Sequence, residues 1–184
     1  MHAIKSKLSL SVKIPVGLEF KDFYENSIKQ SECSLISNEI YVSGYKYSID
    51  YEFLKANKFT HIINCAGDSK RFKPRIYDDF EYLILHIKDD PNFNIEKSVK
   101  EVIKFIEEAN NSCPNRKILI HCFEGISRAP AVLISYLMWK NNVDRETALK
   151  LVKERRPYVE INIGFMSQLD NLKNSFNYFG EDIL

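Results

Sequence analysis

Short apolar runs alternate with helical patterns from about residue 39 onward, and this alternation limits the fold more than any other feature of the sequence. Four runs read as strands, and two of them, at residues 61–65 and 82–87, are apolar enough to be buried. The other two are residues 40–42 and 117–121. Strands that alternate with helices are typical of a mostly parallel sheet. The sequence therefore predicts an α/β fold in which helices flank a central, mostly parallel twisted sheet of about four to five strands.

Helical patterns fill the spaces between and after these runs. Ser48 is a candidate cap for a helix that carries Tyr51. Asn94 is a candidate cap for a helix that ends just before Pro114. Three further helical segments are expected, the first apolar almost all round and the others amphipathic: residues 131–140, 144–155 and 165–176.

The composition suits one globular domain, because 45% of the 184 residues are hydrophobic and 28% are charged. No internal repeat, low-complexity tract or Gly/Ser-rich linker interrupts the sequence. We expect an N-terminal extension of unknown role at residues 1–32, one domain at residues 33–178 and a tail at residues 179–184.

Charge and cysteine content narrow the classes of function. The formal net charge is +1, so nothing global attracts the chain to nucleic acid or an anionic membrane, and any attraction to phosphate must be local. Four cysteines are too few for a disulfide scaffold and fit a reducing compartment, the cytoplasm or the nucleus. Lysines interrupt the apolar residues near the N-terminus, so we expect no secretory signal, and no run reaches the ~18 apolar residues of a membrane span.

The segment between the strand at 117–121 and the helix at 131–140 contains a cysteine and an arginine separated by five residues. It reads His121-Cys122-Phe123-Glu124-Gly125-Ile126-Ser127-Arg128-Ala129-Pro130. A loop in this place points its backbone N–H groups at the positive end of the helix, which makes an anion site without any lysine. Gly125 allows the tight curvature of such a loop. A phosphate group fits a site of this kind.

Cys122 and Arg128 suit nucleophilic attack on phosphorus. Cysteine reacts as the thiolate, and the amides and helix dipole that bind phosphate also stabilise a thiolate. The planar guanidinium of Arg128 can hold two phosphate oxygens at once, which the point charge of a lysine cannot do. The alternative is a buried structural cysteine beside an unrelated arginine. Because the strand, the glycine, the spacing and the helix all agree, the sequence favours the catalytic interpretation.

Cleavage of a phosphate ester also requires a proton for the leaving oxygen. Asp89-Asp90-Pro91 lies in a loop after the strand at 82–87, which is a suitable place for the acid. Two aspartates in a loop are more often a solvated turn or a helix cap. In a chain that also carries Cys122, one of them is expected to act as the acid and then as the base that activates water. The residues alone leave Asp89 and Asp90 both open.

The region from about residue 39 to residue 172 resembles the catalytic domain of a dual-specificity phosphatase, a cysteine-dependent branch of the protein-tyrosine-phosphatase superfamily, in its atypical small single-domain form. The resemblance rests on the loop quoted above, the strand at 61–65, the loop at Asp89 and a late run. That run is Arg155-Arg156-Pro157 with Ile161-Asn162-Ile163-Gly164-Phe165. The resemblance implies a protein-tyrosine-phosphatase-like fold, a phosphocysteine intermediate on Cys122 and a phosphate ligand in Arg128.

The resemblance also implies roles for neighbouring residues. It favours Asp89 over Asp90 as general acid, because related domains place their acid seven residues after the Tyr-Leu start of the strand, here Tyr82-Leu83. His121 is expected to support the loop near the thiolate. No cofactor and no metal ion are implied. The residues expected to bind the substrate phosphate are those of the phosphate loop: Phe123, Glu124, Gly125, Ile126, Ser127 and Arg128.

The sequence departs from the family pattern directly after the arginine. Most relatives carry Ser or Thr there, whose hydroxyl can donate a hydrogen bond to the leaving thiolate, but the methyl group of Ala129 cannot. We therefore expect slow breakdown of the phosphocysteine, with Ser127 as a partial substitute for the missing hydroxyl.

Two further segments resemble features of particular relatives. The Arg-Ala-Pro run and the position of Cys65 are similar to those of the regenerating-liver phosphatases, which implies a reversible Cys65–Cys122 disulfide. The simpler alternative is that Cys65 only packs in the core. Residues 5–10 faintly resemble a docking motif for mitogen-activated kinases, and a plain edge strand is the alternative.

The favoured substrate is a phosphoprotein. The phosphate loop contains no lysine, which argues against inositol phosphates, and the chain is not basic, which argues against RNA triphosphate ends. Phosphotyrosine is expected to be accepted, and phosphothreonine or phosphoserine if the cavity is shallow. The alternatives are a pseudophosphatase that binds phosphoproteins without turnover, and a phosphatase for a lipid or nucleotide. We expect a monomer, with a protein kinase among the candidate partners and neither nucleic acid nor membrane as a partner.

Overall fold

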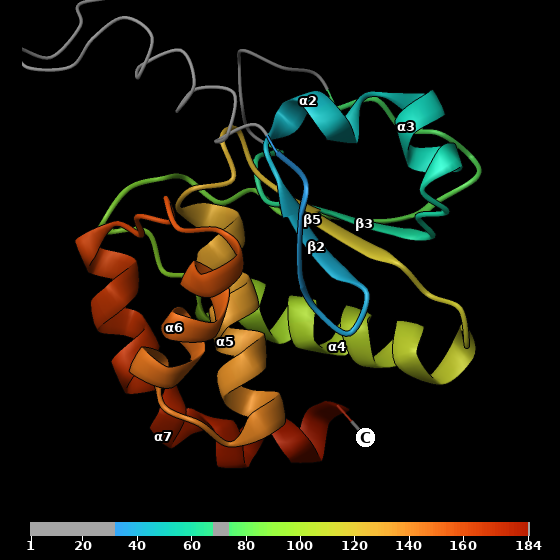
Figure 1. The fold of residues 1–184 in the computed structure, drawn as a ribbon. Coiled ribbons are helices and arrows are strands. Elements are labelled where there is room, and N and C mark those ends of the chain that lie inside the picture. Colours follow the sequence, from blue (N-terminus) through green and yellow to red (C-terminus); the bar gives the residue numbers. More distant parts are fainter. Residues whose placement is uncertain (1–31, 68–73, 184) are drawn as a thin grey trace, which may run out of the picture.

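The computed structural model describes residues 32–67 and 74–183 (Figure 1). Its centre is one five-stranded sheet with the strand order β1-β2-β5-β3-β4. The strands are β1 (Ser34–Ser37), β2 (Ile40–Ser43), β3 (His61–Asn64), β4 (Glu81–Ile84) and β5 (Ile118–His121). The helices are α2 (Tyr45–Ser48), α3 (Tyr51–Ala56), α4 (Glu96–Ser112), α5 (Arg128–Asn141), α6 (Arg145–Arg155) and α7 (Ile163–Ile183).

The sheet is mostly parallel, as the sequence predicts. β5 lies between β2 and β3 and pairs with both in parallel, and β3 pairs in parallel with β4. Only β1 is antiparallel, to β2. β1 has no counterpart among the predicted strands, and a turn with positive φ at Asn38 and Glu39 returns it to β2. The α/β fold class with four to five strands is therefore confirmed, with β1 as the additional strand.

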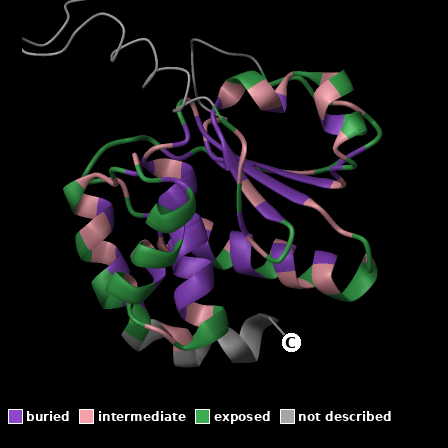
Figure 2. Ribbon diagram, in the orientation of Figure 1, coloured by how far each residue is buried: buried purple, intermediate pink, exposed green. Residues whose placement is uncertain are grey.

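Helices cover both faces of the sheet and bury two clusters of apolar residues. Figure 1 shows α2 and α3 on one side of the sheet and α4, α5, α6 and α7 on the other. On the α3 side, Leu54 packs with Ile62 and Leu119. On the other side lies the larger cluster, which includes Ile63, Ile120 and most of α5. Residues 129–138 of α5 are all buried, which confirms the prediction of a central buried helix (Figure 2).

Two predictions about the segments around these elements are wrong. Ser48 does not cap a helix. It is the last residue of α2, and Asp50 caps α3 by accepting a hydrogen bond from the Phe53 amide at 3.0 Å. The run 82–87 is not one buried strand, because β4 ends at Ile84 and lies at the edge of the sheet with both of its end residues exposed. Only residues 85 and 87 of the following loop turn inward and are buried.

The start of α4 and the end of α7 differ slightly from the sequence prediction. Ile95 occupies the cap position of α4, while the Asn94 side chain accepts a hydrogen bond from the Glu96 amide at 2.8 Å. α7 runs to Ile183, so residues 179–183, which we expected as a tail, continue this helix. The docking-like run at residues 5–10 lies outside the described residues. Within the ranges that the structure describes, no helix combines the length and the apolar character needed to span a bilayer.

Candidate active site

The phosphate loop joins the central strand to the central helix. β5 ends at His121 and α5 begins at Arg128, so the loop lies at the N-terminus of a buried helix. Gly125 has a φ of 72°, a conformation that other residues rarely adopt, and a Cβ there would lie 2.6 Å from the Ser43 carbonyl oxygen. The Gly125 amide donates a hydrogen bond to the sulfur of Cys122 at 3.2 Å. The curvature of the loop therefore directs at least one backbone N–H toward the sulfur.

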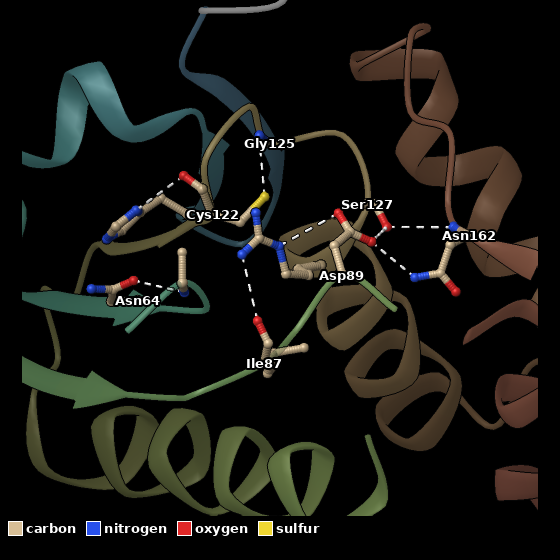
Figure 3. A network of polar contacts seen from close by, with 10 residues as sticks. Asn64, Ile87, Asp89, Cys122, Gly125, Ser127 and Asn162 are labelled. Atoms are coloured by element: carbon tan, nitrogen blue, oxygen red, sulfur yellow. Dashed lines mark hydrogen bonds and ion pairs between the residues drawn. The ribbon is translucent and has the colours of Figure 1, made fainter. Parts of the chain in front are cut away.

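Cys122, Arg128 and Asp89 line one cavity of about 1010 Å³. Cys122 is only 2% exposed, so its sulfur lies deep, at the base of the loop. Asp89 comes from the loop after β4, and Figure 3 shows its carboxylate directed toward Ser127 and Asn162 beside Cys122. The structure thus brings Asp89, from a separate segment of the sequence, to the loop that carries Cys122 and Arg128, although the chemical roles of the three residues remain predictions.

Two hydrogen-bond donors and one cation surround the carboxylate of Asp89. The Ser127 hydroxyl donates to Asp89 Oδ1 at 2.7 Å, and the Asn162 amide group donates to the same oxygen at 2.9 Å. Arg128 Nε lies 3.5 Å from Asp89 Oδ2. Asp90 instead accepts a hydrogen bond from the Asn92 amide at 2.8 Å, within a local turn. Of the two aspartates, only Asp89 lines the cavity.

Arg128 has a donor that its protein neighbours leave unsatisfied. Nη1 donates to the Ile87 carbonyl oxygen at 3.5 Å, but the buried Nε has no hydrogen-bond acceptor within the described part of the chain. The 3.5 Å contact with Asp89 Oδ2 is an ion pair whose geometry is not that of a hydrogen bond. A buried donor without an acceptor costs about 1–3 kcal/mol. A phosphate oxygen in the cavity is a suitable acceptor for it.

Two side chains behind the loop are held in neutral form by burial. Burial lowers the pKa of His121 to about 4, so its imidazole is neutral at pH 7, and Nδ1 lies 3.4 Å from the carbonyl oxygen of Cys122. Burial also raises the pKa of Cys65 well above its ordinary value. Cys65 and Cys122 are both free thiols, and the Cys65 amide donates to the His121 carbonyl oxygen at 2.8 Å. The disulfide between them stays a prediction.

Ala129 and Ser127 are the two residues that we expect to affect breakdown of the phosphocysteine. Ala129 is fully buried in the first turn of α5. The hydroxyl of Ser127, which we expected to replace the missing hydroxyl in part, donates to Asp89 instead. This hydrogen bond connects Ser127 to the candidate acid rather than to the sulfur.

Asn162 is a site residue to which the sequence analysis gave no role. Its Oδ1 accepts a hydrogen bond from the Phe165 amide at 2.9 Å, as a cap of α7 does, while its Nδ2 donates to Asp89. One side chain therefore starts a helix and holds the candidate acid. An Asn directly before a helical pattern signals the first task, but the second depends on a contact with a residue 73 positions away.

Gly164 lets the start of α7 approach the loop that carries Asp89. A Cβ at this position would overlap the backbone carbonyl of Pro91. Gly164→Ala is expected to push the loop away and to lower kcat by about 100-fold, the effect of misplacing a catalytic group by ~1 Å. Steady-state kinetics with p-nitrophenyl phosphate measure this loss.

The exposed helical residue Asn171 provides the control, and Asn171→Ala is expected to keep the wild-type kcat. Without a clash, Gly→Ala in a helix stabilises by up to about 1 kcal/mol. A Gly164→Ala protein with a raised Tm and an unchanged kcat would show that the close approach has no effect on the site.

The fold and the site together define a class of protein. A buried strand runs into a loop with Cys122 and Arg128 at the start of a buried helix, and the carboxylate of Asp89 lines the same cavity. This is the composition of a cysteine-dependent phosphatase site.

Comparisons with known proteins identify the family. The family model described as "Dual specificity phosphatase, catalytic domain" matches residues 40–175. "Dual specificity protein phosphatase 1" of Arabidopsis thaliana is 33% identical over 142 residues, which are 77% of this chain and 69% of that protein. "Dual specificity protein phosphatase 19" of Mus musculus is 40% identical over 121 residues, 65% of this chain and 52% of that protein. The chain spans 17% of "Protein-tyrosine-phosphatase MKP1" of Arabidopsis thaliana, with 34% identity over the matched part.

Solved structures share the fold. The crystal structure of DUSP15 superposes with a TM-score of 0.74 and 26% identity, over 83% of this chain and 95% of that chain. The human tyrosine phosphatase-like serine/threonine/tyrosine-interacting protein superposes with a TM-score of 0.73 and 28% identity, over 80% of this chain and 99% of that chain. The chain therefore belongs to the dual-specificity phosphatase family and has the protein-tyrosine-phosphatase-like α/β fold.

Proposed function

We propose that this chain hydrolyses phosphotyrosine, and phosphothreonine or phosphoserine, in protein substrates through a phosphocysteine intermediate. The observation that carries the proposal is the convergence of Cys122, Arg128 and Asp89 on one cavity. Family membership supports phosphatase activity on proteins. The intermediate and the role of each residue are inferred from the geometry.

The first step transfers the phosphoryl group to sulfur. The thiolate of Cys122 attacks phosphorus, and the bond from phosphorus to the ester oxygen breaks. The loop amides and the guanidinium of Arg128 hold the remaining phosphate oxygens and stabilise their charge in the transition state. Asp89 in its protonated form gives its proton to the leaving oxygen. The products of this step are the dephosphorylated side chain and phosphocysteine.

The second step releases inorganic phosphate. Asp89, now a carboxylate, takes a proton from a water molecule, whose oxygen attacks phosphorus. The bond between sulfur and phosphorus breaks, and Cys122 leaves as the thiolate. The methyl group of Ala129 gives this thiolate no hydrogen bond, so we infer that the second step limits turnover.

The walls of the cavity favour a peptide over a polyphosphorylated molecule. Three acidic residues line the cavity, Glu124 in the loop and Glu160 and Asp170 outside it, and Arg145 is paired with Asp170 at 2.6 Å. These carboxylates repel additional phosphate groups, such as those of inositol phosphates or a triphosphate end. Apolar wall residues that can contact an aromatic ring are Ile161, Ile163 and Met166.

Two other functions remain as alternatives. The human protein named as tyrosine phosphatase-like shares the fold, and together with Ala129 this makes a phosphoprotein-binding module without turnover the second candidate. A phosphatase for a lipid or a nucleotide is the third. A panel of phosphotyrosine peptides, phosphothreonine peptides and phosphoinositides, each assayed for phosphate release, separates the three. Release from peptides supports the proposal, release from phosphoinositides alone contradicts it, and binding without release identifies a binding module.

The role of Asp89 has its own test. Asp89→Asn keeps the shape of the side chain but removes the proton that the leaving oxygen needs in the first step, so kcat/KM for a phosphothreonine peptide should fall by about 10²–10⁴-fold. With p-nitrophenyl phosphate the loss of kcat/KM should be smaller, because p-nitrophenolate leaves readily without a proton. Asp90→Asn is the matched control and should keep most of the wild-type kcat/KM. A larger loss for Asp90→Asn than for Asp89→Asn would assign the acid to Asp90.

A further inference from the structure

Arg156 carries a charged side chain that is completely buried, with 0% exposure, directly after α6. It belongs to the late run Arg155-Arg156-Pro157, for which the proposed mechanism has no use. Burying a charged side chain is costly unless hydrogen bonds compensate. The acceptors around its guanidinium therefore indicate its task.

Two of these acceptors belong to the phosphate loop. Arg156 Nε donates to the Gly125 carbonyl oxygen at 2.7 Å, and Nη2 donates to the Glu124 carbonyl oxygen at 3.1 Å. The contact is close enough that a Cβ on Gly125 would lie 2.6 Å from Nη2. The guanidinium thus packs directly against the outer side of the loop.

The opposite edge of the guanidinium is bound to the start of the sheet. Nη1 donates to the Glu32 carbonyl oxygen at 2.6 Å, to the Ser34 hydroxyl at 3.0 Å and to the Val42 carbonyl oxygen at 3.4 Å. Val42 is in β2, which pairs with β5 beneath the loop. The side chain therefore connects the loop to a rigid part of the fold.

Peptide geometry explains what this contact does to the loop. In a planar trans peptide the C=O and the following N–H point in opposite directions. When the carbonyls of Glu124 and Gly125 point outward to Arg156, the N–H groups of Gly125 and Ile126 must point the other way, toward the cavity. The hydrogen bond from the Gly125 amide to the sulfur of Cys122, at 3.2 Å, agrees with this orientation.

We propose that Arg156 is a positioning residue that sets the orientation of the anion-binding amides at Gly125 and Ile126 by holding the carbonyls of the same two peptides. The inference deepens the proposed function, because the anion in question is the phosphoryl group of the substrate. Arg156 itself does not touch that group. An arginine suits this position because its planar fork reaches two carbonyls at once, whereas a lysine presents one point charge.

The test measures anion affinity separately from turnover and from stability. Tungstate is a tetrahedral anion like phosphate, and calorimetry gives its Kd without any reaction. Arg156→Lys keeps the charge but cannot hold both carbonyls, and Arg156→Met removes both charge and donors. The neighbouring Arg155 is exposed, so Arg155→Met is the matched control.

We expect Arg156→Lys to raise the Kd for tungstate by about 10-fold and Arg156→Met to raise it further. The loss of kcat is expected to be on the order of 10²-fold, as for removal of one oxyanion donor. Arg155→Met should match the wild type. Folded Arg156→Lys or Arg156→Met protein that binds tungstate with the wild-type Kd would overturn the proposal, even if its Tm is lower, because a purely structural role changes only Tm.

The outcomes also separate this inference from the proposed function. Wild-type protein that binds tungstate but releases no phosphate from any substrate contradicts the proposed function, while the comparison of Kd values still decides the role of Arg156. If Arg156→Met does not fold, the Kd of Arg156→Lys decides.

Discussion

Cys122→Ser is expected to lower kcat by about 10⁴–10⁶-fold, the range seen when an enzyme loses its nucleophile. The serine hydroxyl stays protonated at neutral pH and cannot attack phosphorus as a thiolate does. Because serine is close to cysteine in size, the phosphate loop should keep its shape and its affinity for tungstate. Initial rates with p-nitrophenyl phosphate measure the loss, and calorimetry with tungstate measures the affinity.

Cys113→Ser is the control for the chemistry of Cys122, because Cys113 lies at the end of α4 and does not line the cavity. It should keep the wild-type kcat. Brief reaction with ³²P-labelled substrate, quenched in acid, should label the wild-type protein and leave Cys122→Ser unlabelled. Label retained on Cys122→Ser would place the intermediate on another residue and contradict the mechanism.

Arg128→Lys is expected to lower kcat by about 10³–10⁵-fold, the contribution of an arginine that stabilises a phosphoryl transition state. A lysine keeps the positive charge but cannot hold two phosphate oxygens with one planar group. The Kd for tungstate should rise as well, because the phosphate ligand is lost in the ground state too. The measurements are steady-state kinetics and calorimetry under the same conditions.

Arg145→Lys is the matched control, since Arg145 lines the same cavity but is paired with Asp170. It should change kcat by a few-fold at most. Equal losses for Arg128→Lys and Arg145→Lys would mean that the planar fork of Arg128 has no special role, and would contradict its assignment as the phosphate ligand.

Local patterns in the sequence are sufficient to predict the centre of the fold. β5 and α5 are apolar over nearly their whole length, and both form where the sequence predicts them. β1 (Ser34–Ser37) was missed because it is short and half polar, and it becomes a strand only by pairing with β2. The strand at 82–87 was predicted too long. Residues 85 and 87 are apolar because they are buried in a loop, and in the sequence they continue the apolar pattern of the strand.

In the candidate site, too, local features can be predicted from the sequence, whereas features that depend on tertiary contacts cannot. The spacing of Cys122 and Arg128 is a local signal, and the fold needs only one loop to bring them together. The contact of Asn162 with Asp89 and that of Arg156 with the loop cannot be predicted from the sequence, because the partners are 73 and 31 positions away. Asp89 and Asp90 are equivalent as sequence neighbours, and only tertiary structure turns one toward the cavity and the other into a turn.

The attachment of the Asp89 loop to α7 has a consequence for the energetics of substrate recognition. Asn162 holds the carboxylate, and Gly164 lets Pro91 rest against the helix, so the segment has its working conformation as part of folding. Its conformational entropy is lost when the domain folds rather than when a phosphopeptide arrives. Preorganisation of this kind leaves most of the interaction energy of a phosphate group available for affinity and for the transition state.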